Sequence, residues 1–100
     1  MEPPTSPTAQ QIAAGHAFGK HVVGLREFPE VTGRGPEARQ QFAQIVERVM
    51  NSADNKPLAG GRHAYWEDAS HTLVIVNASA ADGGTCFRPR LGRSYYERLS

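Results

Sequence analysis

The sequence has a single cysteine, Cys86, and no apolar run that approaches the roughly 18 residues of a membrane-spanning helix. One cysteine excludes an intramolecular disulfide and a zinc site built from cysteines, and it fits a domain that works in a reducing compartment. A nucleophilic cysteine needs a nearby base and a lowered pKa, and the sequence indicates neither. We therefore expect Cys86 to be a small apolar strand residue. Residues 1–4 lack the basic and apolar regions of a signal peptide, so we expect any export signal to lie elsewhere.

Motifs for metals and phosphates are also lacking. The histidines at positions 16, 21, 63 and 71 show neither a His-x-x-x-His nor a Glu-x-x-His spacing. We therefore expect no metal site and no cofactor. The stretch Asp82-Gly83-Gly84 predicts a hairpin turn and not a phosphate-binding loop.

The sequence has no large excess of positive or negative residues, because its formal net charge is only +1. Such a total does not by itself indicate a nucleic-acid-binding protein. Its distribution is more informative, because residues 86–100 contain four arginines and a single acid, Glu97. The four are Arg88, Arg90, Arg93 and Arg98. We expect a local basic patch near this end of the chain.

The length of 100 residues, 39% of them hydrophobic, predicts one domain with a modest core. Residues 1–7 contain three of the seven prolines and no apolar periodicity. We interpret them as a linker or the cut end of a longer effector polypeptide, and residues 8–100 as a single domain.

Two helices are expected in the first half of the chain. Thr8 can cap a helix that runs from Gln10 to Val23, in which Gly15 and Gly19 lie one turn apart and predict a close approach of backbone to the sheet or to a ligand. Pro36 suits the first turn of a second helix. The second helix carries apolar residues at helical spacing, namely Phe42, Ile45, Val46, Val49 and Met50. Between the helices, Phe28 and Val31 are expected to cover one edge of the core.

Strand signals gather between residues 61 and 90. We expect strands over 62–66, 72–77 and 85–88, with the nearly continuous apolar run at 73–76 in the centre of the sheet. Residues 51–61 read as a loop, and residues 94–99 as either a short helix or a final strand. The predicted fold class is α+β, with N-terminal helices packed on a twisted antiparallel sheet of about four strands.

The densest polar cluster is Gly15-His16-x-x-x-Lys20-His21. On a regular helix His16 and Lys20 share a stripe, whereas His21 lies about 140° around from His16 at 100° per residue, so one histidine is expected to be functional. A histidine beside a lysine suits general base chemistry on a phosphodiester. The plainer alternative is a core or capping histidine beside a surface lysine.

A second group of candidates lies on the expected strands. Arg62, Tyr65 and Arg88 could orient a phosphate, and Thr85 could donate to a phosphate oxygen or position a 2′-hydroxyl. Strand alternation puts Thr85 and Phe87 on one face and Arg88 on the other, so one cleft can use all of them only if the chain re-aims Arg88. Alternatively, the arginines only solvate a sheet edge, and Tyr65 packs in the core.

These residues together resemble a known group. They are similar to the C-terminal toxin domains of bacterial polymorphic and contact-dependent inhibition systems, and more broadly to the barnase/EndoU/colicin/RelE (BECR) superfamily of metal-independent ribonucleases. The segments that carry the resemblance are Gly15-His16-Ala17-Phe18-Gly19-Lys20-His21-Val22, Glu27-Phe28-Pro29, Gly61-Arg62-x-Ala64-Tyr65-Trp66, Asp82-Gly83-Gly84-Thr85-x-Phe87-Arg88-Pro89 and Gly92-Arg93-Ser94-Tyr95-Tyr96. The resemblance implies helices before a four- or five-stranded antiparallel sheet whose cleft holds the active site.

Colicin D is the nearest analogy for residue roles. Its helical Lys-His pair is similar to Lys20-His21, which implies His21 as general base and Lys20 as phosphate clamp. Its Ser-x-Trp is similar to Thr85-x-Phe87, which implies Thr85 as an orienting hydroxyl. Two roles stay open. Arg62 or Arg88 is implied as the cation that stabilises the transition state, and the proton donor to the leaving oxygen is one of His16, His63 and Tyr65.

The resemblance implies an endoribonuclease toxin that cleaves RNA, for which tRNA is a candidate, by 2′-hydroxyl attack to leave a 2′,3′-cyclic phosphate. It also implies secretion within a larger effector, action in the cytoplasm of a target cell, and a cognate immunity protein with acidic groups. Two alternatives remain at this point. One is a non-catalytic RNA-binding or interaction module, and the other is a toxin directed at NAD.

Overall fold

The computed structural model describes residues 5–100 and has the α+β arrangement that the sequence predicts. Three helical segments precede the sheet: α1 (Pro7–Ala14), the π-helix η1 (Phe18–Gly24) and α2 (Pro36–Met50). The remaining elements are β1 (Asp54–Pro57), the short 3₁₀ turn η2 (Ala59–Gly61), β2 (His63–Glu67), β3 (Thr72–Val76), β4 (Gly84–Phe87) and α3 (Arg93–Arg98). The expectation of a linker at residues 1–7 falls partly outside the described residues.

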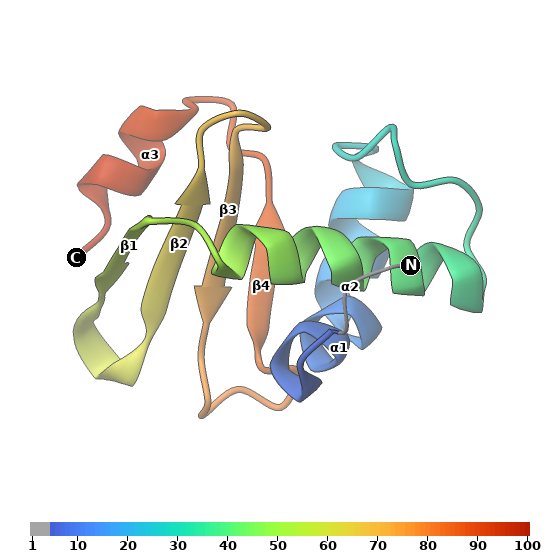
Figure 1. Ribbon diagram of the computed structural model, residues 1–100, viewed down its shortest axis with the longest axis horizontal. Coiled ribbons are helices and arrows are strands. Elements are labelled where there is room, and N and C mark those ends of the chain that lie inside the picture. Colours follow the sequence, from blue (N-terminus) through green and yellow to red (C-terminus); the bar gives the residue numbers. More distant parts are fainter. Residues whose placement is uncertain (1–4) are drawn as a thin grey trace.

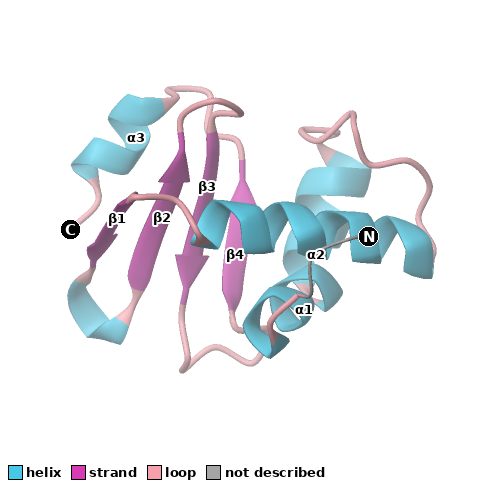
Figure 2. Cartoon of the chain, viewed as in Figure 1, coloured by secondary structure: helices cyan, strands magenta, loops and turns pink. Residues whose placement is uncertain are grey.

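The four strands form one antiparallel sheet in the order β1-β2-β3-β4 (Figure 2). The three predicted strands are confirmed, but the fourth strand, β1, lies where the sequence predicts a loop. β1 reads Asp-Asn-Lys-Pro and has no apolar side chain to mark it. Backbone pairing with β2 stabilises it, and its position at the sheet edge tolerates Pro57.

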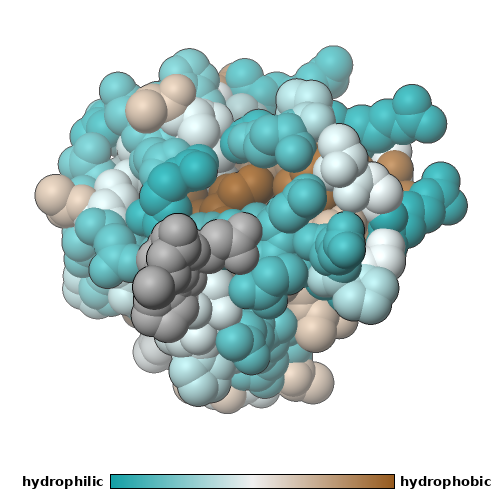
Figure 3. Space-filling view, turned by 45° about the vertical axis from the view of Figure 1, so that its right-hand side comes forward, coloured by the Kyte–Doolittle hydropathy of each residue, from teal (hydrophilic) through white to brown (hydrophobic). Residues whose placement is uncertain are grey.

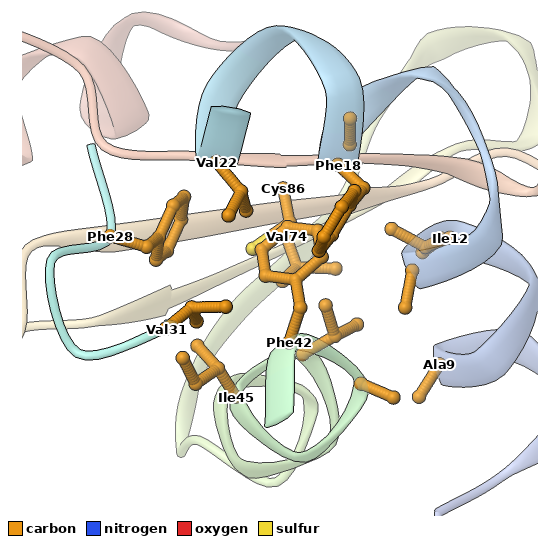
Figure 4. Packing of buried hydrophobic residues seen from close by; sticks show 14 of the residues in the cluster. Ala9, Ile12, Phe18, Val22, Phe28, Val31, Phe42, Ile45, Val74 and Cys86 are labelled. Atoms are coloured by element: carbon orange, nitrogen blue, oxygen red, sulfur yellow. The ribbon is translucent and has the colours of Figure 1, made fainter. Parts of the chain in front are cut away.

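Each face of the sheet has its own apolar cluster. α1, η1 and α2 cover one face, where Val74 and Cys86 pack with the phenylalanines of the helical layer (Figures 1 and 4). On the opposite face, here called the second face, Trp66 and Leu73 pack with Tyr96 of α3. Cys86 is fully buried, as predicted, and burial raises the pKa of its thiol, which rules out an accessible nucleophile there.

The first helical region differs from the prediction of one regular helix from Gln10 to Val23. The helix begins earlier, because Ser6 and not Thr8 is the N-cap, and it ends at Ala14. Gly15 lies against the β3–β4 turn, where an added Cβ would come within 2.5 Å of the Cβ of Asp82. The predicted close approach is therefore confirmed at Gly15. At Gly19 no atom of the sheet lies within 4 Å of the Cβ position, so an approach to the sheet is wrong there.

Several other predictions are confirmed. α2 begins at Pro36 and buries Phe42, Val46 and Val49, while Phe28 and Val31 close one edge of the core. Of the two alternatives predicted for residues 94–99, the structure has the short helix, α3, and not a final strand. No helix within residues 5–100 is both long and apolar enough to span a bilayer. Seen from the side of the helical layer, the surface is mostly hydrophilic, with apolar residues at the bottom of a furrow (Figure 3).

Candidate active site

His21 and Glu27 form a histidine–carboxylate pair at the β4 edge of the sheet. The Nδ1 atom of His21 lies 2.9 Å from Oε2 of Glu27, and the two side chains are only 10% and 19% exposed. A carboxylate oxygen can only accept, so Nδ1 carries the hydrogen and Nε2 of the neutral ring is the acceptor. Nε2 has no hydrogen-bond partner among the described residues. The pair therefore holds a histidine in the orientation and tautomer that a general base needs.

The local backbone brings this pair together. η1 has π-type geometry, in which the Leu25 amide donates to the carbonyl of Lys20 at 2.8 Å. The chain then reverses at Arg26, whose φ of 53° is left-handed, and the Glu27 amide donates to the carbonyl of His21 at 2.9 Å. The turn therefore returns the Glu27 side chain to His21, six residues earlier in the sequence.

Strand β4 fixes the other side of both residues. The imidazole of His21 stacks on Phe87 with ring centroids 5.3 Å apart and an interplanar angle of 23°. The second carboxylate oxygen of Glu27 accepts a hydrogen bond from the Arg88 amide at 2.8 Å. Tyr95 of α3 contacts Phe87 edge to face, with centroids 5.4 Å apart. The pair is thus held by groups from η1, β4 and α3, which lowers the entropy cost of its geometry.

A second histidine–carboxylate pair lies toward the other end of β4. Nδ1 of His16 contacts Oδ2 of Asp82, and this hydrogen bond holds the pKa of Asp82 below its usual value. Both residues line a pocket of about 220 Å³ with two other predicted site residues, Arg62 and Thr85. Arg62 is steadied at Nε by the carbonyl of Ala59 at 3.0 Å. The pocket therefore combines a titratable group, a cation and a hydroxyl.

The two pairs share one side of strand β4. Thr85 and Phe87 are two residues apart, so their side chains leave the same face, separated by about 7 Å along the strand. Their strand partners Ile75 and Leu73 belong to the second face. Thr85 lines the pocket with His16, and Phe87 stacks on His21. The structure therefore brings His16, Thr85 and Arg62 together in one pocket, while His21 lies against Phe87, two residues farther along the same face of β4.

Arg88 points away from this group, as strand alternation predicts. Its guanidinium donates to both carboxylate oxygens of Glu30 at 2.8 and 2.5 Å and to the hydroxyl of Thr72 at 2.9 Å. The same group lies 4.3 Å from the ring centroid of Phe28. The structure thus ties the side chain of Arg88 to the segment after η1, where its guanidinium also donates to the backbone carbonyl of Glu27 at 3.1 Å. The backbone amide of Arg88 is the group that donates to the carboxylate of Glu27.

Two other predicted residues lie on the helix-covered face. Tyr65 packs against the core of the helical layer, and its ring centroid is 4.7 Å from that of His63. Nε2 of His63 lies 2.9 Å from Oδ1 of Asn55 on the edge strand. The sheet therefore separates Tyr65 and His63 from Thr85. Lys20 is exposed beside His21 in the chain, and its side chain has no hydrogen bond or ion pair with any of residues 5–100.

Sequence reasoning missed the two carboxylates. Glu27 lies six residues after His21, a spacing that places no two side chains together on a regular helix, so only the left-handed turn at Arg26 could reveal the pairing. For Asp82 the sequence predicts only a place in a hairpin turn, and no local pattern links it to His16, 66 residues earlier. The one sequence feature that could indicate Glu27 as a partner of His21 is its position as the first acid after the histidine-bearing helix.

Within the described residues, no three histidine, cysteine or carboxylate side chains are arranged to hold a metal ion together. Comparison with models of known protein families and with curated proteins gives no match to this chain. The geometry of the two histidine–carboxylate pairs is therefore what indicates the chemistry of the site.

Proposed function

We propose that the chain is an endoribonuclease that cleaves RNA by using the 2′-hydroxyl of the RNA itself as the nucleophile. The His21–Glu27 pair carries this proposal, because it fixes the tautomer of an imidazole and leaves Nε2 available to accept a proton. In RNA the 2′-hydroxyl nucleophile is already held beside the phosphorus atom. The protein then needs only to move protons and to stabilise charge on the phosphate oxygens.

In the proposed reaction, Nε2 of His21 takes the 2′-hydroxyl proton as the 2′-oxygen bonds to phosphorus. The bond from phosphorus to the 5′-oxygen breaks, and that oxygen takes a proton from a second group. Of the three candidate donors, His16 is favoured, because it lines the pocket that contains Thr85, whereas Tyr65 and His63 are across the sheet. The products are a 2′,3′-cyclic phosphate and a 5′-hydroxyl.

Charge and orientation come from Arg62, Thr85 and Lys20. Arg62 and Thr85 share the pocket with His16, so they can contact a phosphate and a ribose there. Lys20 is exposed beside His21 and acts as a phosphate clamp. Arg88 supports the site through the hydrogen bond from its backbone amide to the Glu27 carboxylate, while its guanidinium bonds Glu30 and the Glu27 carbonyl.

The wider role we propose is that of a toxin in competition between bacteria. The domain is then delivered within a larger effector, acts on RNA such as tRNA in the cytoplasm of the target cell, and is neutralised by an immunity protein. Such an inhibitor is expected to present acidic groups to the cations beside the cleft.

The test is incubation of the purified domain with total bacterial RNA in excess EDTA, followed by gel and end-group analysis. We expect discrete fragments with cyclic-phosphate ends from the wild type and none from His21→Ala. The matched control is His71→Asn, because His71 is exposed with φ of 52°, which asparagine tolerates. Intact RNA from folded wild type contradicts the proposal, and the same preparation then needs assays for RNA binding and NAD consumption.

A further inference from the structure

A pocket of about 310 Å³ lies between η1 and the segment that follows it. Its volume falls at the lower end of the range for small-ligand sites. Two exposed arginines, Arg26 and Arg34, contribute to its lining. The apolar part of the lining includes Val22, Val23, Phe28 and Val31. Figure 4 shows Val22, Phe28 and Val31 gathered at one side of the core cluster. The pocket thus joins an apolar floor to two positive charges.

Both arginines are available to a ligand. Arg48, Arg88 and Arg93 each form an ion pair with a carboxylate. In contrast, Arg26 and Arg34 have neither an ion pair nor a hydrogen bond with any residue from 5 to 100. Two guanidinium groups beside one apolar surface complement a ligand that has a planar apolar part and a phosphate.

The pocket adjoins the proposed catalytic pair through the chain itself. Val22 follows His21, and Arg26 and Phe28 flank Glu27. Residues that line the pocket are therefore direct chain neighbours of the two residues that form the pair. A nucleotide bound in the pocket is therefore close to the base that removes the proton. RNA-binding proteins commonly hold single-stranded bases on apolar and guanidinium surfaces.

We propose that this pocket binds one nucleotide of the RNA substrate next to the cleaved bond, with its base on the valine floor and a phosphate on Arg26 and Arg34. This inference rests on the proposed ribonuclease function and deepens it. The pocket then determines which nucleotide neighbours the cut, because the base sits in a bounded space whereas the arginines bind any phosphate.

The test measures binding of a labelled single-stranded RNA by fluorescence anisotropy at several salt concentrations, in the non-cleaving His21→Ala background. Arg26→Gly removes the guanidinium and suits the left-handed backbone, and Arg34→Gln removes the second charge. The matched control is Arg98→Gln, an exposed arginine in the last turn of α3, because this end of the chain lies beside β1 and η1 lies on the β4 side of the sheet (Figure 1). Thermal unfolding of each variant checks the fold.

We expect each pocket variant to weaken RNA binding on the order of tenfold and to reduce the salt slope by about 1, with little effect from the control. An abasic residue at one position of the RNA is expected to weaken binding to the His21→Ala parent and to have less effect when Arg26→Gly is added. If the wild type cleaves RNA but both pocket variants bind like the control, the pocket proposal is wrong. If the variants lose binding and the wild type does not cleave, the pocket is an RNA-binding site, but the ribonuclease proposal fails and with it the placement of the nucleotide beside a cleaved bond.

Discussion

At the scale of single residues, Glu27 is the group whose role can be isolated most cleanly. Glu27→Gln keeps the shape of the side chain and an oxygen for the Arg88 amide, but it removes the charge beside Nδ1 of His21. An amide can present its NH₂ to Nδ1, which favours the wrong tautomer. We expect kcat for RNA cleavage to fall by about 10²- to 10⁴-fold, the usual size of a general base contribution, with a small change in RNA affinity.

The control for this variant is Glu37→Gln, which alters an exposed glutamate in the first turn of α2. Its cleavage rate is expected to match the wild type. Single-turnover kinetics on a defined RNA check both variants. A rate for Glu27→Gln equal to that of Glu37→Gln would mean that the carboxylate only supports the turn at Arg26 and does not act on the imidazole of His21.

At the scale of elements, the two tyrosines of α3 have separate tasks. Tyr96 is 6% exposed and stacks on Trp66 with ring centroids 6.0 Å apart, whereas Tyr95 is 37% exposed and contacts Phe87. We expect Tyr96→Ala to lower the free energy of unfolding by about 3 kcal/mol, as for a buried aromatic residue. Tyr95→Ala is expected to lower it by about 1 kcal/mol or less.

Urea unfolding followed by tryptophan fluorescence measures both changes, because Trp66 is the only tryptophan and lies under Tyr96. We expect the cleavage rate of Tyr95→Ala to fall although its free energy of unfolding changes little, since Phe87, which stacks on His21, loses a neighbour. Equal losses of stability in the two variants would show that α3 packs on the sheet as a whole and not through Tyr96.

The elements also show why some parts of the fold could be predicted and others could not. α2 and β3 bury many apolar side chains, so Phe42 and Leu73 mark them in the sequence. β1 depends on backbone pairing and has no such mark. The break at Gly15 depends on Asp82, which no local pattern connects to it. Residue type and the neighbouring lysine mark His21 as a candidate in the sequence, but its pairing with Glu27 depends on the left-handed backbone of Arg26.

At the scale of the whole molecule, carboxylates fasten distant segments to one another. Glu67 of β2 accepts bonds from Nε and Nη2 of Arg48 on α2 at 2.8 and 2.9 Å, and Glu47 of α2 accepts from the Ser6 amide at 2.6 Å. These bonds hold the pKa of both carboxyls below its usual value. The pKa of Glu30 is lowered in the same way, chiefly by its bond from Arg88. Protonation of Glu67 therefore weakens the attachment of α2 to the sheet, protonation of Glu47 weakens that of α1 to α2, and protonation of Glu30 weakens that of the segment after η1 to Arg88.

The direction of the pH effect follows from these lowered values. Because the pKa of each group is lower in the folded state, the unfolded state binds more protons in acid, and the added stability is complete only above about pH 4.5. We expect the melting temperature to fall as pH drops below 5 through the folded pKa values. Glu67→Gln, which lacks one such carboxyl, is expected to melt lower than the wild type at pH 7 and to approach it by pH 3. Glu37→Gln, on an exposed turn, is expected to follow the wild-type curve. Parallel curves for Glu67→Gln and the wild type from pH 7 to pH 3 would mean that the bond from Arg48 contributes nothing that depends on charge.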